Sequence, residues 1–380
     1  MSIRRILRNK KFKKFIGRLS SLTDKRMKGK VKHPISSCLL IIILAELSGC
    51  NYFREFVTFA NKHKNQLTKL GLLPNGVPSH DTLERIVQQV DRFELDELLL
   101  KTLFPQINGR PIISIDGKNL RATKDSSFEG SYQGMKDILT AFLCDSKLSL
   151  LSESKGDKGS ETATIPCLIR RIHEYFPELN PYISIDGIGI TKEILTLLNE
   201  YEYDFVICFK RNENIMKEIN LFCDGGKTVS DITTNSCRIE TRKFSLYSPE
   251  EIVGIEQWLS YISYIGRMDS VVENTKTNKR TENKLFYFTS DISLDEFMNV
   301  RRHHWAIENS LHYVLDNSFK EDRLRMKKGS ACENMNLLRK FVLNVIALTN
   351  FNTESVSAYR DSMKYFTARQ LLYRIVGVLA

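Results

Sequence analysis

The chain has 380 residues, a formal net charge of +11 and 42% hydrophobic residues. This length suits two or three domains of roughly 100–200 residues each, and the hydrophobic fraction is sufficient for a sizeable core. The eight cysteines are scattered without any C-x-x-C pair, which argues against a zinc ribbon or a disulfide framework and favours reduced thiols in a cytoplasmic protein. No secretory signal pattern is present. The longest apolar run, residues 35–50, is shorter than the ~20 residues of a membrane span and is predicted to be a buried helix.

The basic excess lies at the N-terminus. Residues 1–33 contain thirteen Lys and Arg against one acid, whereas acids and bases nearly balance in the rest of the chain. Lys10, Lys11, Lys13 and Lys14 form a run that can neutralise DNA phosphates and release counterions. The alternative is a solvated, partly disordered tail. We favour DNA contact by this arm.

Residues 34–105 are predicted to form a small helical domain that binds DNA or is associated with a DNA-binding domain. Its expected helices cover residues 35–47, 52–70 and 82–100, with a break at Pro74-Asn75-Gly76. Ser79 and Asp81 are both candidates for the N-cap of the last helix. At the other end of the chain, residues 351–380 are predicted to be a helical segment.

Residues 111–350 are predicted to be an α/β domain. Short strands are expected at 112–116, 138–144 and 148–152, followed by a helix at 162–176, a strand at 182–186, a helix at 191–201 and a strand at 204–209. This order, β-β-β-α-β-α-β, is that of the ribonuclease H-like fold. Short alternating runs between about 225 and 292 predict a β-rich insertion, and residues 294–316 have strong helical character.

Two of the predicted strands end on an aspartate that is followed by glycine, at Asp116 and Asp186. Open α/β sheets place their active sites at the carboxyl ends of strands, and two carboxylates there form a hard oxygen site for Mg²⁺ or Mn²⁺. Either aspartate alone could be a strand-end cap or turn former, but the repeated pattern favours a site. Glu308, on the predicted helix, is the candidate third carboxylate. Three such carboxylates could hold two ions that activate the attacking oxygen and stabilise the leaving oxygen at a phosphodiester.

His304, Glu308 and His312 are spaced i, i+4 and i+8, so they would share one face of a helix. Zinc is disfavoured there because the H-E-x-x-H pattern is absent and no cysteine is near in the sequence. The apolar side chains of the same segment are predicted to be core: Trp305, Ile307, Leu311 and Val314. Basic side chains around the acids could hold the DNA backbone or be surface charges: Lys118, Arg121, Arg302, Arg323 and Arg325.

The sequence resembles the ISAs-one family of H-repeat-associated proteins, which are DDE transposases with a ribonuclease H-like core. The resemblance runs over nearly the whole chain. It is carried by residues 24–100 with Pro78-Ser79-His80-Asp81-Thr82-Leu83, by Ile115-Asp116-Gly117-Lys118, by Arg238-Ile239-Glu240-Thr241-Arg242, and above all by residues 302–325, with His304-Trp305-x-Ile307-Glu308-Asn309-Ser310-Leu311-His312 and Phe319-x-Glu321-Asp322.

The resemblance implies that Asp116, Asp186 and Glu308 are catalytic and hold two Mg²⁺ or Mn²⁺ ions. It implies a DNA transposase of an insertion sequence, acting on double-stranded DNA at element ends and at a target. Water would attack the phosphodiester at each element end and free a 3′-hydroxyl. That hydroxyl would then attack target DNA by transesterification. A homo-oligomer on DNA is expected because two ends must be joined, in a cytoplasmic, nucleoid-associated protein.

The sequence departs from the family at two places. The second aspartate is followed by Gly187-Ile188-Gly189-Ile190 where the family has Ala-x-Gly-Cys-Gln. His304 and Leu315 stand where related transposases carry Arg and Lys, and Arg302 is the candidate to supply the missing charge. A ribonuclease H-like nuclease that only hydrolyses DNA, and an inactive DNA-binding remnant, both remain alternatives at this point.

Overall fold

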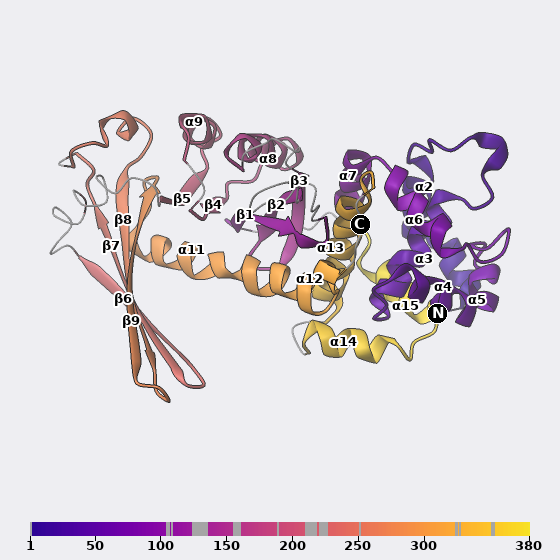
Figure 1. Cartoon of the computed structure of the whole chain (residues 1–380). Coiled ribbons are helices and arrows are strands. Elements are labelled where there is room, and N and C mark those ends of the chain that lie inside the picture. Colours follow the sequence, from indigo (N-terminus) through magenta and orange to yellow (C-terminus); the bar gives the residue numbers. More distant parts are fainter. Residues whose placement is uncertain are drawn as a thin grey trace.

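The computed structural model places one long mixed sheet between helices, with a separate group of helices at one end (Figure 1). It describes residues 2–103, 107, 109–123, 136–154, 161–187, 190–209, 219, 227–250, 252–323, 326, 328–350 and 354–380. The α/β class predicted from the sequence is confirmed.

The sheet has nine strands in the order β3-β2-β1-β4-β5-β9-β8-β7-β6. In its first half, β1 (Ile112–Leu120) is antiparallel to β2 (Lys136–Leu143), and β2 to β3 (Leu148–Ser154). On its other side β1 runs parallel to β4 (Tyr182–Ile185), which runs parallel to β5 (Asp204–Phe209). The chain order β1-β2-β3-α8-β4-α9-β5 is the predicted one, with α8 at Glu161–Tyr175 and α9 at Lys192–Glu200.

Each face of this half-sheet is covered because its strands are apolar on both sides. Ile113 and Ile115 point into a core shared with α8 and α9. Ile112 points the opposite way, into a core shared with α11 (Leu294–Ile307) and α13 (Ala331–Asn350). Alternation along β1 therefore sends Ser114, Asp116 and Lys118 toward the α11 side of the sheet.

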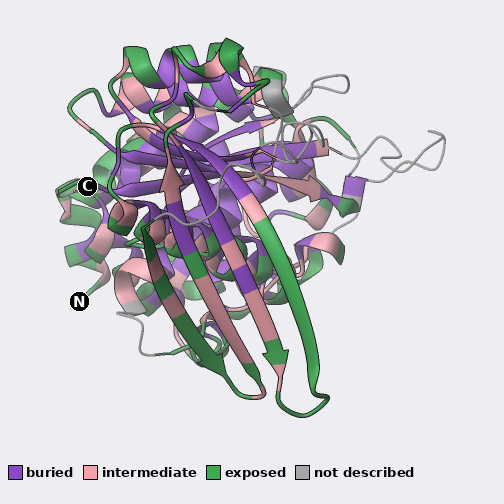
Figure 2. Cartoon of the chain, turned by 90° about the vertical axis from the view of Figure 1, so that its left-hand side faces the viewer, coloured by how far each residue is buried: buried purple, intermediate pink, exposed green. Residues whose placement is uncertain are grey.

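The second half of the sheet is a four-stranded antiparallel extension: β6 (Thr228–Asn235), β7 (Arg238–Tyr247), β8 (Tyr264–Asn274) and β9 (Lys279–Thr289). It is the predicted β-rich insertion, and β9 joins it to β5 in one continuous sheet. Of these strands, β9 is buried where it pairs with β5 and exposed at its other end, whereas the outermost strand β6 has no buried residue (Figure 2). Close contact with α11 occurs at Gly266, where a Cβ would lie 2.7 Å from the Phe297 ring.

The N-terminal helices are α1 (Ile3–Arg8), α2 (Lys10–Ser21), α3 (Ile35–Leu47), α4 (Phe53–Lys62), α5 (Lys64–Lys69), α6 (His80–Gln89) and α7 (Arg92–Leu103). The entirely buried α3 agrees with the predicted helix 35–47. No helix among the described residues is long and apolar enough to cross a membrane. Ser79 caps α6 as predicted, since its hydroxyl accepts a hydrogen bond from the Thr82 amide.

The predicted helix 82–100 is wrong at its centre, because the chain leaves the helix at Val90 and starts α7 at Arg92. The Asp91 carboxylate accepts hydrogen bonds from the amides of Phe93 and Glu94, which caps the new helix. The predicted helix 52–70 is likewise divided at His63, between α4 and α5.

The basic arm is folded in this structure, unlike the disordered tail considered as its alternative. Phe12, Phe15 and Leu19 of α2 are buried in the helical core, and Phe15 stacks on Phe341 of α13. The intervening lysines are exposed, as expected for an amphipathic helix.

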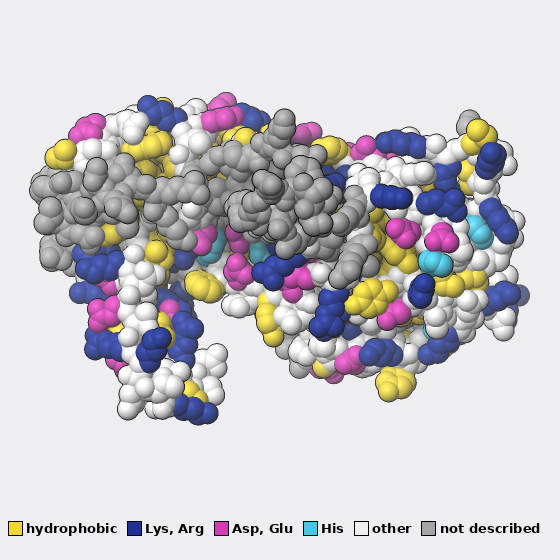
Figure 3. All heavy atoms as spheres, in the orientation of Figure 1, with side chains coloured by type: hydrophobic (Ala, Val, Ile, Leu, Met, Phe, Trp, Pro, Cys, Tyr) yellow, Lys and Arg dark blue, Asp and Glu magenta, His cyan; other side chains and the backbone are white. Residues whose placement is uncertain are grey.

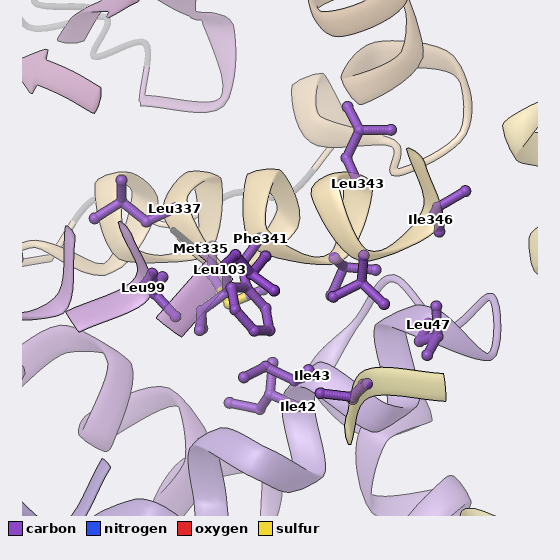
Figure 4. Close-up of a cluster of buried hydrophobic side chains, with 14 of the residues drawn as sticks. Ile42, Ile43, Leu47, Leu99, Leu103, Met335, Leu337, Phe341, Leu343 and Ile346 are labelled. Carbon is purple, nitrogen blue, oxygen red and sulfur yellow. The ribbon is translucent and has the colours of Figure 1, made fainter. Parts of the chain in front are cut away.

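Helix α13 lies between the sheet and the N-terminal helices and contacts both (Figure 1). Its apolar side chains, including Met335 and Phe341, pack on α3 and α7 (Figure 4). On the sheet side, the buried Lys340 ammonium donates to the hydroxyls of Thr140 and Ser152. The C-terminal helices α14 (Val356–Met363) and α15 (Ala368–Val378) pack against α13, and α15 also contacts α1, α3 and α5.

Candidate active site where the pairing of strands β1 and β4 ends

Asp116 and Asp186 occupy neighbouring positions of the sheet. The parallel pairing of β1 and β4 ends at Ile115 opposite Ile185, and each aspartate is the next residue. The Gly117 amide restrains the Asp116 carboxylate by donating a 2.8 Å hydrogen bond to its Oδ1 atom. Both aspartates are half-buried.

Glu308 approaches Asp116 from the long helical segment that crosses the sheet. Helix α11 ends at Ile307, residues Glu308–His312 form a π-helical turn, and α12 (Tyr313–Asn317) continues. A capping box at Ser293 and Glu296 fixes the start of α11. A π turn inside a helix is frequent at functional sites, and this one interrupts the continuous α-helix predicted for 294–316.

Three groups with metal-binding atoms converge there, namely Asp116, Glu308 and His312, and one such atom from each lies within 4.8 Å of the others. The Nδ1 atom of His312 is 3.6 Å from Oδ2 of Asp116 and 3.9 Å from Oε2 of Glu308. Burial, together with the charges of Lys118 and Lys340, lowers the pKa of His312 to about 3, so its imidazole is neutral. Asp186 is outside this group of three.

Asp186 lies close enough to Tyr287 of β9 to affect its titration. Burial raises the pKa of the Tyr287 phenol, and the negative charge of Asp186 raises it further. The Arg301 guanidinium, 4.8 Å from the centre of the Tyr287 ring, acts in the opposite direction. Asp186 therefore lies near Tyr287 and outside the group formed by Asp116, Glu308 and His312.

Lys118 is engaged in a buried ionic network beside the site. Its ammonium lies 2.6 Å from Asp316 and 2.9 Å from Glu321, and its side chain is 10% exposed. Burial alone would lower the pKa of Lys118, but the two carboxylates outweigh burial and raise it. Burial likewise opposes ionisation of Glu321, yet Lys118 and Arg339 hold the pKa of that carboxyl below its usual range. Because the ammonium is already paired with these two carboxylates, we do not include Lys118 in the proposed DNA-binding surface.

The other basic residues expected to hold DNA are placed differently. Arg121 is highly exposed, with one nitrogen 3.6 Å from Asp322, and Arg323 is also exposed. Arg302 lies 3.5 Å from Asp231 on β6, so it faces the extension. Arg325 lies outside the described residues.

The N-terminal helices carry a second region of interest. Lys10, Lys13 and Lys14 are exposed on α2, whereas the Lys11 ammonium donates to the Leu379 carbonyl. Elsewhere in this group of helices, a cavity of about 480 Å³ is lined by four cations, Arg26, Lys30, Lys32 and Arg85, and by His33, Val77, Ser79, Thr82 and Gln89. Figure 3 shows Lys and Arg side chains spread over these helices, on the right of the view, and acids near its centre.

Two residues of the site were not singled out from the sequence. His312 was considered only as a zinc ligand together with His304, but the buried His304 ring instead hydrogen-bonds the Ser184 hydroxyl at 2.9 Å. Glu321, which the sequence presents only as part of a family motif, is 2% exposed. Trp305 was predicted to be core and is 53% exposed, whereas Ile307 and Leu311 are buried as predicted.

A model described as the transposase DDE domain matches residues 107–345, well over half of the chain. The chain belongs to this family. A second model, described as associated with that domain, matches residues 16–102 of this DDE-family protein, where its N-terminal helices lie.

Named relatives of this DDE-family protein agree with that result. It is 26% identical to "Putative transposase YncI" of Escherichia coli O157:H7 over 347 residues, 86% of each chain. It is 24% identical to "H repeat-associated putative transposase YhhI" of E. coli K12 over 381 residues, 96% of this chain and 98% of the relative. The resemblance to H-repeat-associated proteins is thereby confirmed. Among solved structures, a piggyBac transposase synaptic complex with hairpin DNA aligns with a TM-score of 0.42 and 9% identity, over 98% of this chain and 81% of that one.

Proposed function

We propose that this DDE-family protein is the transposase of an insertion sequence, which cleaves DNA at the element ends and joins the freed ends to a target. The observation that carries the proposal is the convergence of Asp116 and Glu308, which are about 190 residues apart in the sequence. They meet where the pairing of β1 and β4 ends, and Asp186 directly follows β4 there. We further propose that residues 111–350 have the ribonuclease H-like fold, because the strand and helix order is the one expected of it.

The donor set fits a divalent cation, since two carboxylates and a neutral imidazole offer atoms within 4.8 Å of one another. Asp116, Asp186 and Glu308 would hold two Mg²⁺ or Mn²⁺ ions. When bound, such ions activate an attacking oxygen and stabilise the leaving oxygen of a phosphodiester.

The protein's own contribution is positioning. The Gly117 amide fixes one oxygen of Asp116, and the capping box fixes the helix that carries Glu308. Beside them, the charges of Lys118 and Glu321 are compensated by each other, so the buried ion pair keeps β1 against the segment after α12. Rigid placement of the reacting groups supplies much of the catalysis in reactions of this type.

We propose that the N-terminal helices bind the element ends. The support is electrostatic: Lys10, Lys13 and Lys14 are exposed on one ordered helix, and a cavity lined by four cations lies in the same group of helices. Exposed cations of this kind contact phosphates and release counterions. Because two ends must be cut and joined together, the active form on DNA is expected to be a homo-oligomer acting in the bacterial cytoplasm at the nucleoid.

The test uses the full chain and a plasmid that carries its gene with the flanking DNA. With Mg²⁺ or Mn²⁺ present, the wild type is expected to release the element and to give joined products with labelled ends. Asp116→Asn, Asp186→Asn and Glu308→Gln should each abolish cleavage while DNA binding persists. Asp295→Asn, an exposed acid in the first turn of the same helix, is the matched control and should remain active.

Three results would count against the proposal. Cut products without joined products would indicate a nuclease that only hydrolyses DNA. Binding without any metal-dependent cleavage, unchanged by Asp116→Asn, would indicate an inactive DNA-binding remnant. Full activity of any one of the three variants would remove that residue from the site.

A further inference from the structure

His312 differs from an ordinary core histidine. It is 6% exposed, and among the residues that the structure describes its Nε2 atom is buried without a hydrogen-bond partner. His304, two turns earlier and equally buried, satisfies its ring through Ser184. Buried polar atoms are nearly always paired, but packing, and not a hydrogen bond from Nε2, holds this ring in place, and the candidate ligand atom is the other nitrogen, Nδ1.

The other ring nitrogen of His312 faces the two best-placed carboxylates. Its distances of 3.6 Å to Asp116 and 3.9 Å to Glu308 are too long for hydrogen bonds. They do suit ligands of one shared ion, because atoms that each bind a small divalent cation at about 2.0–2.2 Å lie about 3–4 Å apart.

The π-helical turn explains how His312 and Glu308 come to serve one site. Both ends of this five-residue turn, Glu308 and His312, face Asp116 on β1. The apolar neighbours Ile307 and Leu311 remain fully buried, so the turn presents the two polar groups without exposing the core. Lys118 reinforces this placement, since its ammonium lies 3.4 Å from the His312 carbonyl.

We infer that Nδ1 of His312 is a direct ligand, together with Asp116 and Glu308, of one divalent cation, and that this nitrogen makes the site prefer a transition-metal ion such as Mn²⁺ over Mg²⁺. The inference rests on the proposed function, because it assigns ligands within the same site. Mg²⁺ favours oxygen ligands throughout, whereas imidazole suits first-row transition metals. The site is thus an O,O,N site on its Asp116 side, distinct from the all-carboxylate set that the sequence indicated.

The experiment is Mn²⁺ titration of the full chain without DNA, read by electron paramagnetic resonance, followed by pulsed measurement of nitrogen coupling to the bound ion. Wild type should show ¹⁴N modulation from one imidazole. His312→Gln and the bulkier, ring-retaining His312→Phe should lose that modulation and bind Mn²⁺ at least about tenfold more weakly, the lower limit of the cost of losing even an outer-shell partner. Mg²⁺ should displace Mn²⁺ more readily from both variants than from wild type.

The matched control is His303→Gln. His303 is on the same helix, but its ring contacts the Asn299 carbonyl, outside the site. It should keep both the nitrogen signal and the Mn²⁺ affinity, and circular dichroism should show that all variants are folded.

The outcomes separate the two proposals. Tight Mn²⁺ binding that depends on Asp116 and Glu308 but lacks ¹⁴N modulation, or that keeps it in both His312 variants, would overturn the role of His312 and leave the transposase proposal standing. Failure of the wild type to bind Mn²⁺ at all, in a preparation that also cleaves no DNA, would overturn both.

Discussion

The active-site edge and the N-terminal helices hold charged side chains in opposite ways. At the site, Lys118 and Glu321 are 10% and 2% exposed and compensate each other at 2.9 Å. On α2, Lys10, Lys13 and Lys14 are exposed to solvent on a helix whose other face is buried. Charges of the first kind determine where catalytic groups stand, and removing one weakens the charge compensation of its partners. Charges of the second kind are free to meet a polyanion, and the fold does not depend on them.

The largest effect on stability is expected from Glu321→Gln. This change takes the buried carboxylate from Lys118 and leaves it the partly exposed Asp316 as a partner, so the loss should approach about 3–5 kcal/mol, the cost of breaking a buried pair from one side. Urea denaturation should show this loss in the free energy of unfolding. Glu282→Gln, which affects an acid that is 65% exposed on β9, is the control and should change the free energy by less than about 0.5 kcal/mol. Equal small effects for both variants would contradict the distinction between the two regions.

A smaller effect, dependent on pH, is expected from Lys340. Burial lowers its pKa to about 7 in the folded chain, whereas an unfolded lysine titrates near 10.4. Between these values the unfolded chain binds a proton that the folded chain does not, so this group makes stability increase as pH rises from 7 to 10 and decrease as pH falls through 7.

Lys340→Met removes that contribution. The wild type should gain at least about 1 kcal/mol relative to this variant when urea denaturation is repeated at pH 7 and pH 9.5. Lys279→Met, at the exposed end of β9, serves as the comparison and should keep the wild-type profile. A Lys340→Met profile parallel to the wild type would show that the buried ammonium stays charged throughout.

The smallest effect on stability, but a clear effect on binding, is expected from replacing Lys10, Lys13 and Lys14 together by Gln. Unfolding should change by less than about 0.5 kcal/mol because all three are exposed. The slope of log K against log salt for duplex DNA should become shallower by up to about 2.7, since each phosphate contact contributes about 0.9. An unchanged slope would show that the α2 lysines do not contact DNA.

The sequence predicted those parts of the site that depend on strands. Ile-Asp-Gly occurs twice after a short apolar run, and the parallel pairing of β1 and β4 ends directly before both aspartates, although β1 itself continues past Asp116 to Leu120. It could not predict the π turn at Glu308–His312, because an extra residue in a helix leaves no pattern in apolar spacing. His312 was visible at i+4 from Glu308, but whether a histidine meets an aspartate on another element depends on tertiary packing.

The length of β1 determines where the Lys118 side chain lies. The sequence indicated a strand ending at Asp116, followed by Lys118 as a candidate contact to the DNA backbone or a surface charge. Instead, β1 continues to Leu120 because β2 pairs with it as far as Lys136. Lys118 is therefore on the same side of a strand as Asp116, pointing toward Asp316 and Glu321. The strand β6 was not predicted, because its exposed polar residues lack apolar alternation.

Helix α13 has a consequence for shortened copies of the gene. Its Arg339 pairs with the buried Glu46 of α3, Lys340 binds hydroxyls of the sheet, and the Asn334 amide donates to carbonyls of Val87 and Val90. A stop codon before residue 331 would therefore remove the helix against which both the N-terminal helices and the sheet pack. Such a truncation would not leave the N-terminal helices as an independent DNA-binding fragment. Loss of the last fifty residues would therefore abolish DNA binding and DNA cleavage together.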